Sequence, residues 1–252
     1  MSENAFTAEE MMTIAAARAL SDEAVCFVGI GLPSTAANLA RLTHAPNLVL
    51  IYESGTIGAK PDILPLSIGD GELAETASTV VSTPEVFRYY LQAGRIDVGF
   101  LGAAQIDRFG NINTTVIGDY HKPRVRLPGA GGAPEIASCS REVFVIARQS
   151  RRTFVQELDF VTTVGRRDGG PGRAKGVTRV VTDLGILERE AGGELILTQV
   201  HPGVTEEEVR EATGWSLRVA PAVTETNAPT ATELETLRDL QERTRRARAE
   251  PR

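Results

Sequence analysis

The sequence predicts one α/β domain, with an open and mostly parallel sheet flanked by helices. Short apolar segments alternate along the chain with segments of helical pattern, which is the order of strands and helices in such sheets. Residues 48–52 are almost fully apolar, as expected of a parallel strand that helices cover on both faces. The chain of 252 residues is long enough to bury a core of this size.

The first half of the chain follows this alternation. Thr7 and Glu10 have the spacing of a capping box, and the Ala- and Met-rich residues 8–20 continue a helix. An apolar strand over 24–28 leads through a glycine turn into a helix over 33–42. The remaining elements predicted in this half are a helix over 84–93 and strands over 98–101, 112–117 and 143–147.

The second half opens with a surface loop, because the run 165–176 is rich in glycine and arginine. Two short strands at 179–182 and 186–189 flank a turn and predict a hairpin. Thr205 precedes three glutamates, a favourable start for a helix. Residues 232–252 predict an exposed, charged helix or tail that belongs to the same domain, 1–252.

The composition is that of a globular, soluble protein. Hydrophobic residues make up 42% and charged residues 24%, close to the average of soluble proteins. The net charge of -6 and the lack of a long basic run before the C-terminus argue against a nucleic-acid surface. Residues 1–12 lack the features of a signal peptide, and no apolar run reaches the ~20 residues that span a bilayer. We therefore expect a cytoplasmic protein that binds small molecules or proteins, with no nucleic-acid or membrane partner.

Neither the cysteines nor the histidines indicate a disulfide or a metal site. Cys26 and Cys139 lie in apolar or small-residue runs, which favours buried, reduced thiols. His44, His121 and His201 are too scattered to form a zinc site, which needs ligands with paired spacing. We predict no metal.

Three loops qualify as ligand sites, because open α/β sheets bind ligands beyond the carboxyl ends of their strands. These loops are residues 29–33, 53–55 and 129–133. Glu53 directly follows an apolar strand, where loss of hydration would raise the pKa of its carboxyl and strengthen it as a nucleophile. A helix cap or a surface ion pair is the competing interpretation of Glu53.

The two glycine loops are each open to two interpretations. Gly29 and Gly31 fit a tight turn better than a dinucleotide site, because the third glycine of that fingerprint would fall at Ser34. The amides of 129–133, which precede a helical segment at 134–140, can stabilise an oxyanion or form a flexible turn.

Taken together and in order, these loops resemble the B subunit of class I coenzyme A transferases. The likeness covers most of the chain. The segments that carry it are GIGLPSTAANLARLTHAPNLVLIYESG, FLGAAQIDRFGNINTTVIGDYHKPRVRLPGAGGAPEIAS, GRRDGGPGR, VVTDLGILE, HPGV and TGW.

The resemblance implies a coenzyme A transferase fold and names the residues that act. Glu53 matches the glutamate that attacks the acyl-CoA thioester and then carries coenzyme A as a glutamyl thioester. Gly131 and Gly132 match the glycine-rich site that stabilises the oxyanion. The residues that match the coenzyme A side of the site are Gly29, Gly31, Gln105, Gly129 and Ala133. The thioester bond is conserved in this reaction, so coenzyme A is a substrate and no permanent cofactor is expected.

Asn111 and Asn113 fall in the same motif as Gln105, although both are also common turn residues. Arg166, Arg167, Arg173 and Lys175 could meet coenzyme A phosphates or an acidic substrate, with a solvated loop as the alternative.

The resemblance also implies a missing half. Such enzymes combine two homologous α/β halves, and only the half with the glutamate is present, so an A subunit is expected in a heterotetramer or larger assembly. The substrates would be acyl-CoA and carboxylic, possibly dicarboxylic, acids. The alternatives are a CoA-ester hydrolase or lyase, since some relatives replace the glutamate, and a non-catalytic regulatory subunit.

Overall fold

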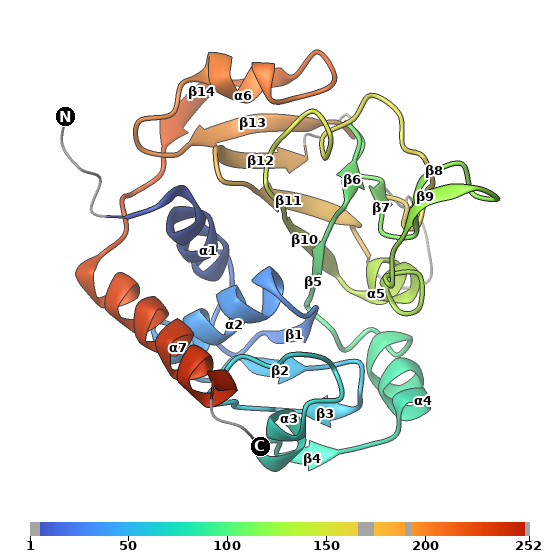
Figure 1. Ribbon diagram of the computed structural model, residues 1–252, viewed down its shortest axis with the longest axis vertical. Helices are drawn as coiled ribbons and strands as arrows, with labels where there is room; N and C mark the ends of the chain where they lie inside the picture. The colour runs from blue at the N-terminus through green and yellow to red at the C-terminus, as the bar shows by residue number, and fades with distance from the viewer. Residues whose placement is uncertain (1–5, 166–173, 190–192, 250–252) are drawn as a thin grey trace.

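The five central strands of the main sheet run parallel, as the sequence predicts. The computed structural model describes residues 6–165, 174–189 and 193–249. Its main sheet has ten strands in the order β14-β13-β12-β11-β10-β5-β1-β2-β3-β4 (Figure 1). Parallel pairing joins β11, β10, β5, β1 and β2. These strands are Val177–Val181 (β11), Glu142–Ile146 (β10), Val98–Gly102 (β5), Val25–Val28 (β1) and Val49–Ile51 (β2).

Further strands extend the sheet on both sides. β3 and β4 follow β2 with antiparallel pairing, and the predicted hairpin is confirmed as the antiparallel pair β11 and β12. β13 pairs antiparallel with β12, and β14 pairs parallel with β13. The bounds are Thr56–Ile57 (β3), Thr79–Val80 (β4), Gly185–Arg189 (β12), Leu195–Val200 (β13) and Arg218–Glu225 (β14).

The prediction of one strand over 112–117 is wrong, because two short strands of separate small sheets occupy this segment. The Asn113 side chain accepts hydrogen bonds from the backbone N–H groups of Thr115 (3.0 Å) and Val116 (3.2 Å), and this local turn interrupts the strand. One sheet pairs β6 with β7 and the other pairs β8 with β9. Their bounds are Gln105–Ile106 (β6), Ile112–Asn113 (β7), Val116–Gly118 (β8) and Pro123–Arg126 (β9).

Helices cover both faces of the central strands and divide the core into two layers. On one face, α1 (Ala8–Arg18), α2 (Leu32–Leu42) and α7 (Ala231–Ala249) pack together (Figure 1). On the other face lie α5 (Ala133–Cys139) and the π-helix η1 (Val86–Leu91). This arrangement explains why residues 48–52 carry almost no polar side chains.

Most predicted helices are confirmed. Thr7 and Glu10 form the capping box of α1, with side chain to backbone distances of 3.1 and 2.7 Å. Thr205 caps α6 (Glu206–Glu211). The helix predicted over 84–93 begins as α4 (Thr83–Glu85) and continues as η1. A further short helix, α3 (Gly71–Glu75), was not predicted.

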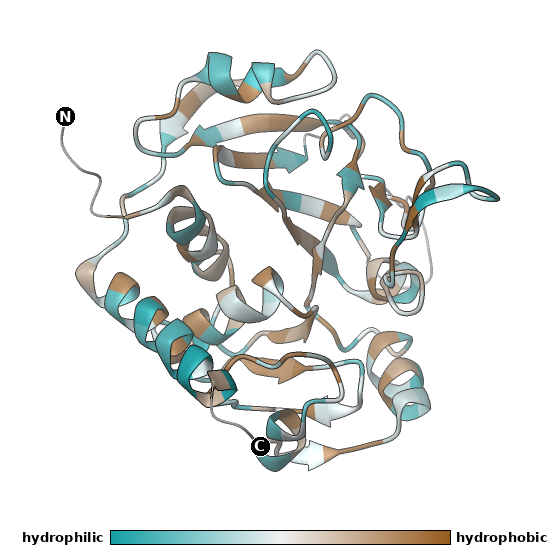
Figure 2. Cartoon of the chain, viewed as in Figure 1, coloured by the Kyte–Doolittle hydropathy of each residue, from teal (hydrophilic) through white to brown (hydrophobic). Residues whose placement is uncertain are grey.

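The prediction that the C-terminal helix is exposed holds for one face of α7 only. Leu234, Leu237, Leu240 and Thr244 are buried against the helices of the first layer. Their spacing of three and four residues makes a narrow apolar stripe, while the outward face is strongly hydrophilic (Figure 2). Because charged residues surround each leucine in the sequence, the segment was predicted to be exposed on all sides.

Both cysteines are free thiols, although only one is fully buried. Cys26 lies within β1, where burial raises the pKa of its thiol. Cys139 ends α5 and is half-buried, with its Sγ atom 3.7 Å from Glu135 Oε1. No helix among the described residues combines the length and apolar character needed to cross a membrane.

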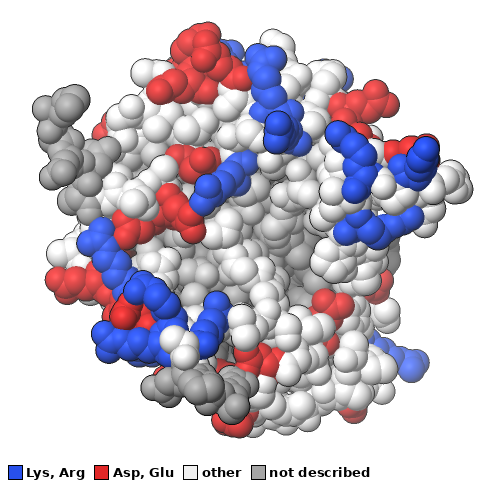
Figure 3. Space-filling model, in the orientation of Figure 1, with Lys and Arg blue, Asp and Glu red and all other residues white. Residues whose placement is uncertain are grey.

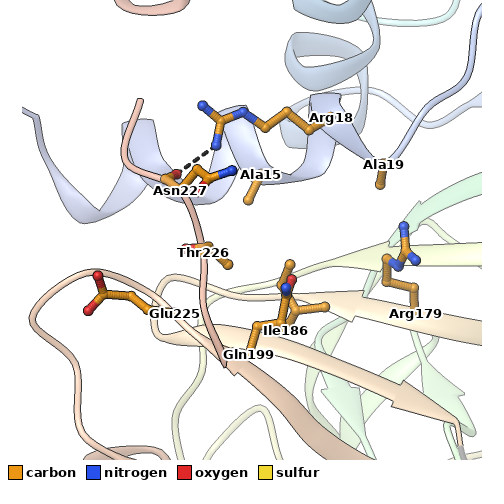
Figure 4. A pocket seen from close by; sticks show the side chains of 9 residues that line it. All are labelled: Ala15, Arg18, Ala19, Arg179, Ile186, Gln199, Glu225, Thr226 and Asn227. Atoms are coloured by element: carbon orange, nitrogen blue, oxygen red, sulfur yellow. Dashed lines mark hydrogen bonds between the residues drawn. The ribbon is translucent and has the colours of Figure 1, made fainter. Parts of the chain in front are cut away.

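Arg18 on α1 connects this helix to the start of α7 through hydrogen bonds. Its guanidinium donates two hydrogen bonds to the Glu233 carboxylate, at 2.7 and 2.6 Å, and further bonds to the Asn227 and Ala228 carbonyls. Figure 4 shows Arg18 reaching Asn227 above a small cavity between α1 and the strands. Burial alone would raise the pKa of Glu233, but the hydrogen bonds from Arg18 and Thr230 outweigh it and lower the pKa to about 2.

Glu233→Gln is expected to lower the free energy of unfolding by about 2 kcal/mol at neutral pH, because it weakens a charged hydrogen-bonded pair. Since the folded pKa lies below the ordinary value of 4.5, this stabilisation is fully present above pH 4.5 and is lost as the pH falls toward about 2. Urea unfolding at several pH values measures it. Glu235→Gln, at an exposed position of the same helix, is the control; an equal loss in both variants would contradict the role of Arg18.

Candidate active site

Glu53 lies in a pocket at the carboxyl ends of the central parallel strands. The chain passes from β1 to β2 on one side and returns through β5 on the other, so the strand order reverses at β1. Open α/β sheets bind ligands at such a point. The pocket has a volume of about 360 Å³, and Gly29, Glu53 and Ala103 from the ends of these three strands line it.

A tight turn between β2 and β3 holds Glu53 in place. The backbone N–H of Gly55 donates to the Tyr52 carbonyl at 2.9 Å, and the N–H of Tyr52 donates to the Thr56 carbonyl at 3.0 Å. Gly55 has a φ of +100°, and a Cβ atom there would lie 1.9 Å from the Val81 carbonyl oxygen. Glycine is therefore required at this position, and the turn has little freedom to move.

The residue before Glu53 anchors the turn from the opposite face of the sheet. The Tyr52 side chain is fully buried, and its hydroxyl lies 3.1 Å from Ser34 Oγ and 3.2 Å from Asn38 Nδ2, both on α2. Tyr52 thus packs into the helical layer, while Glu53 lines the pocket.

The Glu53 carboxylate is half-buried, and burial raises its pKa above the ordinary value of 4.5. Within the described residues it forms no ion pair, which argues against the competing interpretation that it pairs with a surface arginine. A carboxylate that has lost part of its hydration without gaining a cation is a stronger nucleophile than one in water.

The glycines before α5 lie against this carboxylate. A Cβ atom on Gly132 would lie 2.6 Å from Glu53 Oε1, and a Cβ on Gly131 would lie 3.7 Å from the same oxygen. Gly132 is also the N-cap residue, directly before α5. Gly131 and Gly132, the residues predicted to stabilise the oxyanion, therefore lie next to Glu53, the predicted nucleophile. The Glu53 carboxylate occupies the space that a side chain on Gly132 would fill.

The residues predicted for the coenzyme A side separate into two groups. Gly29, Gly129 and Ala133 line the pocket with Glu53. Gly31, with a φ of +86°, is instead the N-cap residue before α2 and is not among the described residues that line the pocket.

Gln105 does not line the Glu53 pocket. Its side-chain oxygen accepts from Asn113 Nδ2 at 2.7 Å, and its Nε2 donates to Asp159 at 3.1 Å, so hydrogen bonds within the chain hold the amide. It lines a neighbouring cavity instead. The Asn111 side chain donates to Asp107 at 2.7 Å, as expected of a turn residue.

The walls of the pocket are residues that the sequence analysis missed. They are mostly apolar, and the Thr114 hydroxyl, buried without a hydrogen-bond partner among the described residues, is the polar side chain that joins Glu53 in the lining. Apolar side chains at strand ends carry no signal that separates a ligand pocket from ordinary core. The wall residues that were missed include Phe27, Val28, Leu101, Leu127 and Ile136.

Lys175 lies far along the sheet from Glu53. It forms an ion pair with Glu142, at 2.7 Å, at the amino end of β10, whereas the pocket opens at the carboxyl ends. Arg166, Arg167 and Arg173 lie outside the described residues. The part of the chain that the structure describes contains no group of three His, Cys, Asp or Glu side chains that could hold a metal ion.

Glu53→Gln is expected to raise the unfolding temperature relative to the parent at neutral pH, and the difference should vanish in acid. Because the folded pKa of Glu53 is raised, the folded state binds its proton more tightly, and stability falls as the pH rises from 4.5 through the folded pKa. Glutamine does not titrate, so the variant does not lose stability as the pH rises. Thermal unfolding in buffers from acid to neutral pH measures the effect; a difference that is independent of pH would contradict it.

The chain shares its sequence and fold with the coenzyme A transferase family. The family model described as coenzyme A transferase matches residues 9–212, and the chain belongs to this family. It is 66% identical over 248 residues to a protein from Pseudomonas knackmussii that is named as the B subunit of 3-oxoadipate CoA-transferase, covering 96% of this chain and 95% of that one.

Solved structures agree with the assignment. Glutaconate coenzyme A-transferase from Acidaminococcus fermentans superimposes with a TM-score of 0.85 at 32% identity, covering 93% of this chain and 94% of that chain. The decarboxylase AibA/AibB superimposes with a TM-score of 0.82 at 29% identity, covering 96% and 98%. The predicted fold class and family are thereby confirmed.

Proposed function

We propose that this chain is the glutamate-bearing B subunit of a coenzyme A transferase and that Glu53 carries coenzyme A during turnover. The observation that carries the proposal is the half-buried Glu53 carboxylate, which lines an apolar pocket beside Gly132 without a cationic partner among the described residues. Its pKa is raised by burial, as suits a nucleophile that must attack a thioester.

The reaction takes place in two symmetrical halves. A Glu53 oxygen attacks the carbonyl carbon of the acyl-CoA, and the coenzyme A thiolate leaves, which gives an acyl-glutamyl anhydride. The thiolate then attacks the Glu53 carbonyl carbon and releases the first acid as its carboxylate. The second acid attacks the resulting glutamyl thioester and the steps run in reverse, so the thioester bond is conserved.

Gly131 and Gly132 would stabilise the oxyanion of each tetrahedral intermediate through their backbone amides. Their position beside the carboxylate supports this role, because a Cβ atom on either residue would lie within 4 Å of Glu53 Oε1. Backbone donors aimed at a developing charge act without reorganising during the reaction.

The acceptor we propose is a dicarboxylic acid, with 3-oxoadipate as the first to test. The support is the 66% identity to a protein named for that acid. Among the described lining residues of the Glu53 pocket there is no lysine or arginine. A cation for the second carboxylate would then lie outside this described lining, in the adjoining part of this chain or in the partner subunit.

An A subunit completes the active enzyme, in a heterotetramer or larger assembly. The relatives are named as B subunits, and the name AibA/AibB also joins two chains. The chain alone should therefore show little activity. We further propose that residues 1–252 form one domain, since a single sheet takes strands from early and late parts of the chain, and that the free thiols belong to a cytoplasmic protein.

Mass spectrometry tests the mechanism directly. The A/B complex is incubated with an acyl-CoA and no acceptor, quenched and digested; we expect coenzyme A attached to the peptide that contains Glu53. The Glu53→Gln complex should give no adduct, and Glu157→Gln, at an exposed glutamate, should behave as the parent. Steady release of free coenzyme A thiol and acid without any adduct would instead identify a hydrolase.

A further inference from the structure

A second cavity adjoins the Glu53 pocket. It has a volume of about 670 Å³ and lies between the β8–β9 hairpin and the segment that follows β10. Ala104 lines both this cavity and the Glu53 pocket. The two cavities are therefore neighbours that meet at Ala104.

Two arginines line this second cavity from opposite segments of the chain. Arg124 belongs to β9 and Arg152 follows β10, and both are exposed. Among the described residues neither guanidinium forms an ion pair. Lys and Arg side chains gather over the same hairpin on the right of Figure 3. Lys122 and Arg126, near and within β9, are also exposed.

The local structure orients Arg124. Gly118 lies beneath it with a φ of +89°, and a Cβ atom there would lie 3.5 Å from Arg124 Cγ and Nε. The stem of Arg124 therefore packs over Gly118, at distances that an added Cβ would meet as an ordinary van der Waals contact. Arg124 lines the wall of the cavity.

The one acidic residue of the cavity lining is already hydrogen-bonded by neutral groups. Asp159 accepts from the Gly118 backbone N–H at 2.8 Å and from Gln105 Nε2 at 3.1 Å. Gln105 in turn accepts from the Asp159 backbone N–H at 3.1 Å. Both bonds to the side chain end on Asp159 Oδ2, and among the described residues the carboxylate forms no ion pair with Arg124 or Arg152.

We propose that Arg124 and Arg152 bind the phosphate groups of the coenzyme A substrate, an inference that rests on the proposed transferase function. Guanidinium groups match phosphate oxygens in geometry and charge. The apolar Glu53 pocket suits the acyl group and the uncharged arm of coenzyme A, while the larger, positively charged cavity suits the nucleotide end. A second carboxylate of the acid is the smaller anion that could compete for the arginines.

Kinetics of the A/B complex with Arg124→Met and Arg152→Met test this proposal. Each variant should raise the KM for acyl-CoA by about tenfold, the effect of losing one charged hydrogen bond, with kcat and the KM for the acid unchanged. Adenosine 3′,5′-bisphosphate should inhibit the parent more strongly than either variant. Arg245→Met, which removes the same charge from α7, is the control.

Three results would overturn the proposal. A raised KM for the acid alone would assign the arginines to the second carboxylate. An unchanged KM for both substrates would mean that the cavity binds neither of them. The variants could also fail to assemble with the A subunit, while the fraction that does assemble keeps the parent KM. This result would show that the cavity is a contact surface for that subunit. The Glu53 adduct at saturating acyl-CoA separates these outcomes from failure of the proposed function, because it should persist in both variants.

Discussion

Glu53→Gln is expected to transfer coenzyme A at about 10⁻⁴ of the parent rate or less, since removal of an enzymatic nucleophile typically has effects of this size. Glutamine has nearly the same shape and no anionic oxygen, so the pocket and the turn should remain intact. The measurement is the initial rate of the A/B complex with saturating acyl-CoA and acid. Binding of acyl-CoA should persist, which shows that the loss lies in the chemical step.

Glu53→Asp separates charge from position. Aspartate keeps the anionic charge but is one methylene shorter, so its oxygens stand back from the thioester carbonyl. A misplacement of this kind lowers rates by about 10². An aspartate variant with the parent rate, or a glutamine variant that keeps more than a few per cent of it, would contradict the covalent mechanism. Glu157→Gln again serves as the control for loss of an exposed carboxylate.

Local chemistry made the framework of the fold predictable. The Thr7 and Glu10 capping box and the apolar residues 48–52 each depend on neighbours within a few positions, and both predictions are confirmed. The prediction of one strand over 112–117 was wrong because the Asn113 side chain accepts hydrogen bonds from the backbone N–H groups of Thr115 and Val116. These bonds form a turn that interrupts the strand. Alternation of residue types does not record such a turn.

The site was predictable to the extent that it follows from strand order. Glu53 and the loop 129–133 were expected at one edge, because parallel strands share their carboxyl ends, and they meet there. The sequence did not show that Gln105, which follows β5 closely, lines the neighbouring cavity, because its amide is hydrogen-bonded to Asp159, 54 positions later in the chain. No sequence pattern indicates that Gln105 pairs with Asp159. Likewise, no pattern indicates which apolar residues line the Glu53 pocket.

Gly132→Ala is expected to reduce transfer by about 10², the effect of a misplaced reacting group. The backbone at Gly132 has φ -94° and ψ -27°, which alanine adopts freely, so the fold should tolerate the change. The added Cβ would lie 2.6 Å from Glu53 Oε1, 2.8 Å from Cδ and 3.0 Å from Oε2. Contacts this short force the carboxylate to swing away from its place in the pocket.

Gly131→Ala is the matched comparison, because its Cβ would lie 3.7 Å from the same oxygen, an ordinary van der Waals contact. We expect this variant to lose less activity than Gly132→Ala, while both unfold at nearly the parent temperature. The yield of the Glu53 adduct and the initial rate should fall together in Gly132→Ala. If Gly132→Ala kept the parent rate, the carboxylate would react from a different position. Equal losses in both variants would indicate a different cause. Each substitution keeps the backbone N–H but could shift the loop, so the loss would then come from displaced backbone amides rather than from contact with the Glu53 carboxylate.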